Sequence, residues 1–264
     1  MYVETLGEGD PEVAVVGGIH GDEPCGVRAV ETLVEEAPAV ERPTLLVIAN
    51  EAAAAQGLRY VDEDLNRAFP GDPGATTHEG RLAAALADRI AECTTLALHS
   101  TQSYGGMFAL VDAVDDLARS VCPRLSVDAV VETGAAEGRI FAAVPDAIEV
   151  ECGRQGTDRA AENAVQVARE FLGATGAVPE WRLDEGADRP LFELGEPIPK
   201  PAARRYEVFA SNFETVGAGD PVAATDDERV IAEEPFAPVL LSAEGYEDVF
   251  GYRGQRVGTL SPDA

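Results

Sequence analysis

Short apolar runs rich in β-branched residues alternate with stretches of helical periodicity over residues 12–172. The apolar runs predict strands at 12–18, 44–49, 95–99, 107–111, 129–132 and 147–151. Apolar residues at helical spacing predict helices at 22–36, 78–92, 114–121 and 158–172. Strands that alternate with helices pack as layers around one sheet. This part of the chain is therefore expected to form an α/β sandwich with a largely parallel or mixed sheet.

The character of the sequence changes after Gly173. Five prolines follow closely, at positions 179, 190, 197, 199 and 201. Beyond them, short strand-like runs alternate with glycine turns at 206–210, 216–220, 239–241 and 256–260. Proline and glycine interrupt regular elements, which favours short strands over helices here. We therefore predict two domains, an α/β domain over 1–178 and a small β-rich domain over 179–264.

The chain is strongly acidic, with 20 Lys and Arg against 48 Asp and Glu, a net charge of −28. Such a charge repels phosphate groups, which argues against binding to nucleic acid or to anionic membranes. The acids are spread along the chain, and Lys200 is the one lysine beside nineteen arginines. A dispersed acidic surface fits the cytoplasm of an extreme halophile, where the Debye length is about 3 Å at 1 M salt. An ordinary acidic protein is the alternative.

The N-terminal sequence and the pattern of cysteines both favour a cytoplasmic protein. The first residues carry no signal-peptide pattern, and no apolar run reaches the ~18 residues of a membrane span. The four cysteines, at positions 25, 93, 122 and 152, are widely separated and form no C-x-x-C pair. Reduced, buried thiols in a cytoplasmic protein are the expectation.

Two of the three histidines follow or end predicted strands. His20 lies in Gly-Ile-His-Gly-Asp-Glu just after the first strand, and His99 ends the strand at 95–99. Ligand sites in open α/β sheets form at strand ends. Glu23 forms an H-x-x-E pair with His20, and His99 completes a set of two histidines and one carboxylate. Although each residue alone also fits a structural role, the set is typical of catalytic zinc.

Two further segments carry groups suited to chemistry. The loop around Asp64-Leu-Asn-Arg67 contains two arginines, Arg59 and Arg67, which either remain solvated or grip a substrate carboxylate. The strand at 147–151 ends in Glu151, and Glu149 shares its face because side chains alternate along a strand. A carboxylate beside a metal site can act as a general base.

Four motifs in this order resemble the succinylglutamate desuccinylase/aspartoacylase family of the zinc carboxypeptidase-like clan. They are His20-Gly-Asp-Glu23, Asp64-Leu-Asn-Arg67 with Phe-Pro-Gly, His99-Ser-Thr and Glu151-Cys-Gly-Arg-Gln. The resemblance implies a three-layer α/β/α sandwich with a mixed, mostly parallel sheet, followed by a C-terminal β domain. It also implies one Zn²⁺ per subunit, held in the first domain by His20, Glu23 and His99.

The same resemblance implies a role for each further site residue. Glu151 matches the general base, and Arg59 matches the arginine that stabilises the oxyanion. Asn66 and Arg67 match the pair that holds the substrate carboxylate. Tyr246 resembles a tyrosine that closes over the substrate, although a core or surface aromatic is an equal alternative.

The implied activity is zinc-dependent hydrolysis of the amide bond of a small, anionic N-acyl amino acid. Two alternatives stay open: a metallocarboxypeptidase acting on peptides, and a non-catalytic binding module on the same scaffold. The sequence also leaves a homo-oligomer open.

One position departs from the family pattern. Aspartoacylases carry an arginine ten residues before the general base, to bind the second carboxylate of aspartate. Phe141 stands there in this chain, and Arg139 lies two residues earlier. N-acetylaspartate is therefore not assigned as the substrate.

Overall fold

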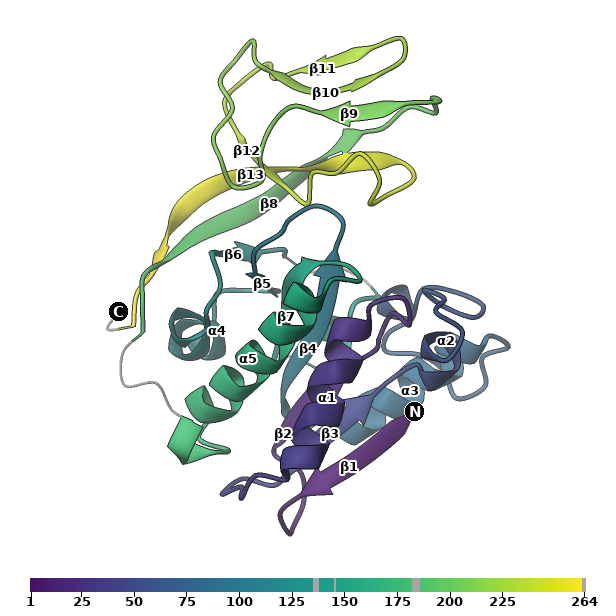
Figure 1. Cartoon of the computed structure of the whole chain (residues 1–264), viewed down its shortest axis with the longest axis vertical. Coiled ribbons are helices and arrows are strands. Elements are labelled where there is room, and N and C mark those ends of the chain that lie inside the picture. Colours follow the sequence, from purple (N-terminus) through teal and green to yellow (C-terminus); the bar gives the residue numbers. More distant parts are fainter. Residues whose placement is uncertain (135–137, 145, 182–185, 263–264) are drawn as a thin grey trace.

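The computed structural model describes residues 1–134, 138–144, 146–181 and 186–262. Within these residues, ten strands form one sheet in the order β1-β3-β2-β4-β7-β5-β6-β8-β13-β12 (Figure 1). Their bounds are β1 Tyr2–Leu6, β2 Val13–Gly17, β3 Thr44–Ile48, β4 Thr94–Thr101, β5 Phe108–Val111, β6 Ala129–Glu132, β7 Ala147–Arg154, β8 Arg189–Pro199, β12 Ala237–Val239 and β13 Val249–Leu260. The helices are α1 Pro24–Glu36, α2 Glu51–Ala54, α3 His78–Ile90, α4 Asp116–Val121 and α5 Asp158–Ala174.

In the α/β part, the sheet lies between two layers of helices, and β2 shows how the sequence produces this arrangement. Val13 and Val15 join the apolar cluster that contains residues of α1, α4 and α5. Ala14 and Val16 point the other way, into the cluster that contains residues of α3. Because both faces of the strand are buried, its sequence is continuously apolar. The three-layer α/β/α sandwich is confirmed.

The sheet is mixed, as predicted. β3, β2, β4 and β7 run parallel to one another, and β6 runs parallel to both β5 and β8. β1 pairs antiparallel with β3, and β5 pairs antiparallel with β7. The parallel centre places the carboxyl ends of β2, β4 and β7 at one edge of the sheet.

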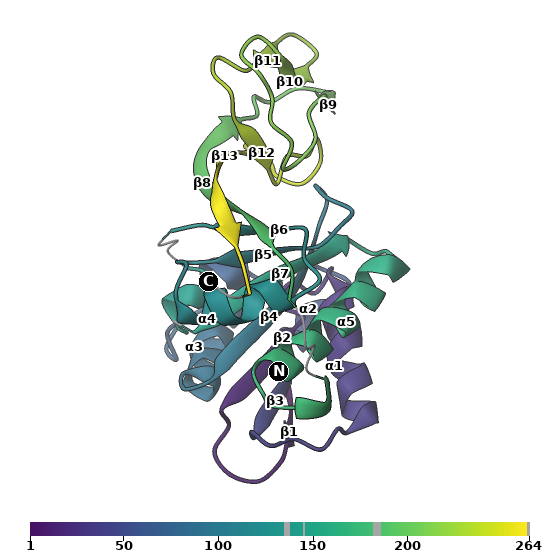
Figure 2. The ribbon, with the colours of Figure 1, turned by 90° about the vertical axis from the view of Figure 1, so that its left-hand side faces the viewer.

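The C-terminal part is built on two long antiparallel strands, β8 and β13, which rise from the main sheet (Figures 1 and 2). At their far end, β9 (Tyr206–Val208), β10 (Pro221–Thr225) and β11 (Arg229–Ile231) form a small antiparallel sheet. Ile198, Val222 and Phe250 belong to the separate apolar cluster of this part. The strand-like run predicted at 216–220 is a bridge residue and a turn, and the strand follows it.

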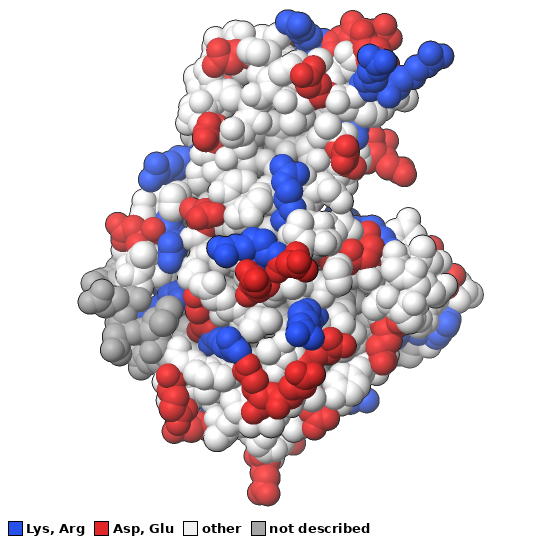
Figure 3. All heavy atoms as spheres, in the orientation of Figure 1, with Lys and Arg blue, Asp and Glu red and all other residues white. Residues whose placement is uncertain are grey.

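The surface in Figure 3 carries acidic side chains over both parts of the molecule, with arginines between them. This distribution follows the dispersed acids of the sequence, and adaptation to high salt stays a prediction. Among the described residues, no helix combines the length and the apolar character that crossing a membrane requires. The division into domains at 178/179 also stays a prediction.

Candidate metal centre

The chain makes a tight connection between β2 and α1, and this connection carries the first two candidate ligands. Gly17 ends β2 against α1, where a Cβ would lie 2.2 Å from the Gly26 carbonyl oxygen. Pro24 opens α1, a position where a missing N–H costs nothing. The segment between β2 and α1 is therefore short and closely packed, and it brings His20 and Glu23 to one point above the sheet.

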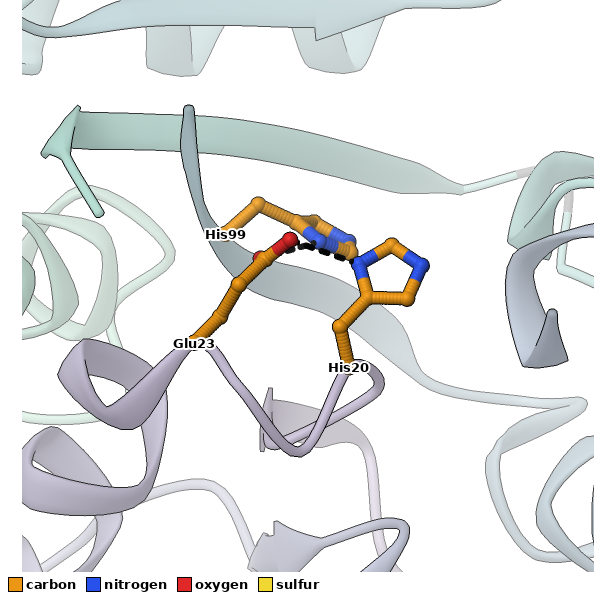
Figure 4. A group of neighbouring side chains, drawn as sticks. All are labelled: His20, Glu23 and His99. Atoms are coloured by element: carbon orange, nitrogen blue, oxygen red, sulfur yellow. Dashed lines mark hydrogen bonds and ion pairs between the residues drawn. The ribbon is translucent and has the colours of Figure 1, made fainter. Parts of the chain in front are cut away.

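The side chains of His20, Glu23 and His99 converge (Figure 4). Nδ1 of His20 lies 2.8 Å from Oε1 of Glu23, and Nδ1 of His99 lies 3.1 Å from Oε2 of the same carboxylate. All three residues are at most 4% exposed. One ligand atom of each lies within 4.8 Å of the others, so the group could hold a metal ion.

The donor chemistry of this group fits a divalent cation. Two imidazoles and one carboxylate form a frequent catalytic zinc set. The surroundings also contain two buried atoms without a hydrogen-bond partner in the described part of the chain, namely Nε2 of His99 and Oε2 of Glu151. Leaving such atoms unpaired costs free energy, which a cation bound at this point would offset.

Asp64 and Arg59 form an outer layer around His20 and Glu23. Nε2 of His20 lies 3.0 Å from Oδ1 of Asp64, an arrangement that directs the other ring nitrogen toward Glu23. Arg59 donates to Oδ2 of Asp64 from Nη2 over 3.1 Å, and to Oε1 of Glu23 from Nη1 over 3.2 Å. Sequence reasoning did not select Asp64, although it opens the Asp-Leu-Asn-Arg motif.

These contacts shift the ionisation of the first two ligands. Burial lowers the pKa of His20, but the Glu23 carboxylate and Asp64 outweigh it and raise the pKa to about 9. Burial raises the pKa of Glu23, but the two histidines hold it far below its usual range. In the metal-free arrangement, these contacts therefore favour the protonated form of His20 and the ionised form of Glu23.

Glu151 lies beside this centre on β7. The parallel β4–β7 pairing sets His99 level with Glu151. Burial raises the pKa of Glu151 to about 7, and the nearby charge of Glu23 adds to the effect. Val150 and Cys152 point to the opposite face, into the cluster with α1 and α5. The predicted alternation along this strand is confirmed, as is the core packing of Cys152.

Glu149 has a different environment from Glu151, although both lie on the same face. It is fully buried and accepts a 2.9 Å hydrogen bond from Nδ2 of Asn66 and an ion-pair contact from Arg139. Burial raises the pKa of Glu149, but the Arg139 and His99 charges and the Asn66 hydrogen bond outweigh it and lower the pKa. Asn66 also accepts a 3.1 Å hydrogen bond from the Ile140 N–H.

Phe141, at the departure from the family pattern, is 7% exposed and packs in the core. The guanidinium of Arg139 lies 5.4 Å from the centre of its ring. Arg139, and not residue 141, therefore faces the same pocket as Glu149 and Glu151.

A pocket of about 290 Å³ brings the predicted site residues together. Its lining contains all eight of them: His20, Glu23, Arg59, Asn66, Arg67, His99, Glu151 and Tyr246. Arg67 is exposed and donates a 2.7 Å hydrogen bond to the Asn66 carbonyl. The C-terminal part supplies Tyr246, whose carbonyl accepts a 2.6 Å hydrogen bond from Lys200 Nζ. The pocket is also lined by apolar residues that the sequence did not single out: Leu110, Leu194, Leu240 and Tyr252.

Comparison with known proteins finds a family model and several relatives of similar sequence. Residues 9–104 match the family model for the succinylglutamate desuccinylase/aspartoacylase catalytic domain. The N-acyl-aromatic-L-amino acid amidohydrolase of Rattus norvegicus is 45% identical over 60 residues, 22% of this chain and 19% of that protein. A probable aspartoacylase of Nostoc is 28% identical over 127 residues, 43% of each protein. The chain thus matches less than half the length of these relatives.

Solved structures share the fold over nearly the whole chain. Murine aminoacylase 3 superimposes with a TM-score of 0.77 at 20% identity, covering 97% of this chain and 98% of that one. A succinylglutamate desuccinylase from Silicibacter has a TM-score of 0.74 at 20% identity, covering 96% and 88%. At this identity the likeness concerns the fold, including the C-terminal β part.

Proposed function

The chain belongs, through residues 9–104, to the succinylglutamate desuccinylase/aspartoacylase family, and from this premise we propose that it is a zinc-dependent hydrolase of small N-acyl amino acids. One observation carries the proposal above all others. His20, Glu23 and His99 converge within 4.8 Å at the wall of a pocket that Glu151 also lines. The names of the relatives, an amidohydrolase and an aspartoacylase, support amide hydrolysis as the reaction type.

His20, Glu23 and His99 are the residues that would hold the zinc. When bound, zinc supplies a Lewis acid that polarises the amide carbonyl and lowers the pKa of water. Asp64 keeps the His20 ring oriented through its 3.0 Å contact, and the Glu23 carboxylate spans both imidazoles.

Glu151 is the general base of the proposed reaction. Its carboxylate removes a proton from the attacking water and returns it to the nitrogen of the departing amine. The C–N amide bond breaks while a C–O bond forms, and the products are a carboxylic acid and a free amino acid. A pKa raised to about 7 suits a group that both takes and returns a proton near neutrality.

Arg59 and Arg67 have separate roles in the proposed reaction. Arg59, next to Glu23, stabilises the charge that develops on the amide oxygen. Arg67 grips the α-carboxylate, aided by the second amide hydrogen of Asn66, whose first is donated to Glu149. Tyr246 closes the pocket from the C-terminal side.

The pocket favours small substrates over peptides. Its volume is about 290 Å³, and Leu240, Gly245 and Tyr246 of the C-terminal part contribute to its lining. Ligand pockets for drug-sized molecules begin near this size, at roughly 300 Å³. A peptide would need an open groove for residues on the acyl side of the scissile bond.

A substrate screen tests the proposal. The purified protein, kept in high salt with added zinc, is incubated with N-acyl amino acids and with peptides, and amine release is measured. We expect turnover of N-acyl amino acids and little cleavage of peptides. Cleavage of peptides alone would indicate a metallocarboxypeptidase, and neither turnover nor bound zinc would leave a binding module.

A further inference from the structure

The wall of the pocket contains a buried ion pair that has no part in the proposed catalysis. Nη2 of Arg139 contacts Oε2 of Glu149, and the two side chains are 15% and 1% exposed. Both residues line the pocket. A cation that would otherwise attract an anionic ligand is therefore already neutralised by a carboxylate of the chain.

Glu149 cannot swing away to make room for a second anion. It lies within β7, and its other carboxylate oxygen accepts the 2.9 Å hydrogen bond from Asn66. Asn66 is itself fixed by the 3.1 Å bond from the Ile140 N–H. A ligand carboxylate placed on Arg139 would lie beside this fixed negative charge, and at low dielectric like charges repel strongly.

The groups around the pair suit an uncharged substituent. Leu110 lies opposite Glu149 in the antiparallel β5–β7 pairing, and Leu194 and Leu240 line the same pocket. Nε of Arg139 is buried and has no hydrogen-bond partner among the residues that the structure describes. This N–H can donate to a neutral oxygen, but it brings no net charge because the guanidinium is already paired.

Arg67 is in the opposite situation. It lines the pocket, is exposed, and belongs to no ion pair within the described part of the chain. Three arginines line the pocket, and two of them are compensated: Arg139 by Glu149, and Arg59 by Glu23 and Asp64. Arg67 is therefore the arginine left to hold one carboxylate.

We propose that Glu149 is a specificity-determining residue that keeps a second negative charge out of this pocket. The substrates are then N-acyl amino acids whose single charge is the α-carboxylate, with an uncharged side chain and an uncharged acyl group. This inference rests on the proposed function and narrows it, since it disfavours N-acetylaspartate and N-succinyl amino acids.

The test compares substrates of equal shape and different charge. We expect kcat/KM for N-acetyl-L-asparagine to exceed that for N-acetyl-L-aspartate at least tenfold, mainly through KM. Glu149→Gln frees the Arg139 charge and should lower this ratio at least tenfold. Arg139→Gln leaves the charge of Glu149 uncompensated and should raise this ratio. Glu193→Gln, an exposed position on β8, removes the same charge and should leave the ratio unchanged.

Two outcomes overturn the inference: a wild-type ratio of one or below, or a folded, active Glu149→Gln variant with the wild-type ratio. If Glu149→Gln does not fold, two measurements still test the inference: the ratio for the wild type, and the increase in this ratio expected for Arg139→Gln. If no N-acyl amino acid is hydrolysed, the proposed function fails. In that case, calorimetric Kd values of the same two compounds test charge discrimination by Glu149 independently of turnover. Equal Kd values would reject the proposed role of Glu149.

Discussion

Asn50 donates a 2.9 Å hydrogen bond from Nδ2 to Oε1 of Glu79, and both residues are fully buried. The Glu79 carboxylate also accepts bonds from the backbone N–H groups of residues 61, 62 and 63, over 2.6, 2.9 and 3.2 Å. This carboxylate in the first turn of α3 therefore ties down the loop between Arg59 and Asp64. It therefore helps to position both residues beside the candidate metal centre.

Glu79→Gln should destabilise the protein by about 1–3 kcal/mol, because a charged acceptor of several hydrogen bonds is lost. Burial raises the pKa of Glu79, but the hydrogen bonds to its carboxylate have the larger effect, so the pKa is lowered overall. The stabilisation is thus present above the unfolded-state pKa of about 4.3 and disappears as the pH falls through the lower folded-state value. Urea unfolding at high salt should show a difference between variant and wild type that is large at pH 7 and shrinks in acid.

Glu92→Gln provides the control, because it removes the same charge from an exposed position just after α3. It should leave the urea midpoint within about 0.5 kcal/mol of wild type. A pH-independent difference for Glu79→Gln would contradict the role of its ionised form.

Zinc should compete with a proton on His20. Its pKa is raised to about 9, so its stabilising contact with Glu23 in the metal-free protein is complete below about 6.5 and is lost as the pH rises through 9. Zinc binding at pH 7 should therefore release about one proton, and zinc affinity should increase up to about pH 9. Calorimetry in buffers of different ionisation enthalpy measures the release.

His20→Ala should abolish stoichiometric zinc binding, as measured by metal analysis. His78→Ala, which replaces the third histidine at the start of α3, should retain the metal. Loss of zinc from the His78 variant alone would place the centre elsewhere.

Glu151→Gln should lower kcat by about 10²–10⁴-fold while zinc remains bound. The amide keeps the shape of the side chain but cannot take a proton from water. Glu162→Gln, in which an exposed carboxylate of α5 is replaced, should keep full activity. An unimpaired Glu151 variant would refute the base assignment, whereas loss of zinc would show that Glu151 supports the metal centre instead.

Lys200→Met should raise KM more than it lowers kcat. Lys200 holds the Tyr246 carbonyl at 2.6 Å, and its ammonium lies 4.3 Å from the centre of the Tyr206 ring. Without this bond, the segment that closes the pocket loses its fixed position. Steady-state kinetics would test this against Arg205→Met, an exposed cation nearby, and equal KM changes in the two variants would contradict it.

The α/β part was predictable because its signals are local. The apolar run of β2 and the alternation of β7 follow directly from burial on one or both faces. The candidate ligands were predictable because His20 and Glu23 are close in sequence and His99 lies within a readable strand. Their convergence also depended on the resemblance to a family.

Other features are set by tertiary contacts. β8 was missed because Pro190, Pro197 and Pro199 read as a loop, yet all three pair with β13. Residues 191–193 are the ones that pair with β6, so all three prolines lie outside that pairing, and prolines are tolerated where a strand edge is unpaired. Glu149 was seen to share the face of Glu151, but its pairing with Arg139 depends on the 138–144 segment folding back, which no spacing reveals.

The strands β8 and β13 extend from the main sheet into the C-terminal part, and this limits how the C-terminal part can be exchanged during evolution. β8 pairs with β6 at one end and with β13 along its length, and the far ends of both strands contribute to the apolar cluster around Phe250. A chain cut at residue 178 would leave β6 as a bare sheet edge, open to pairing with other chains. The C-terminal part could therefore be exchanged between related proteins only together with its two long strands, so recombination within this lineage should preserve that hairpin as a single inherited block.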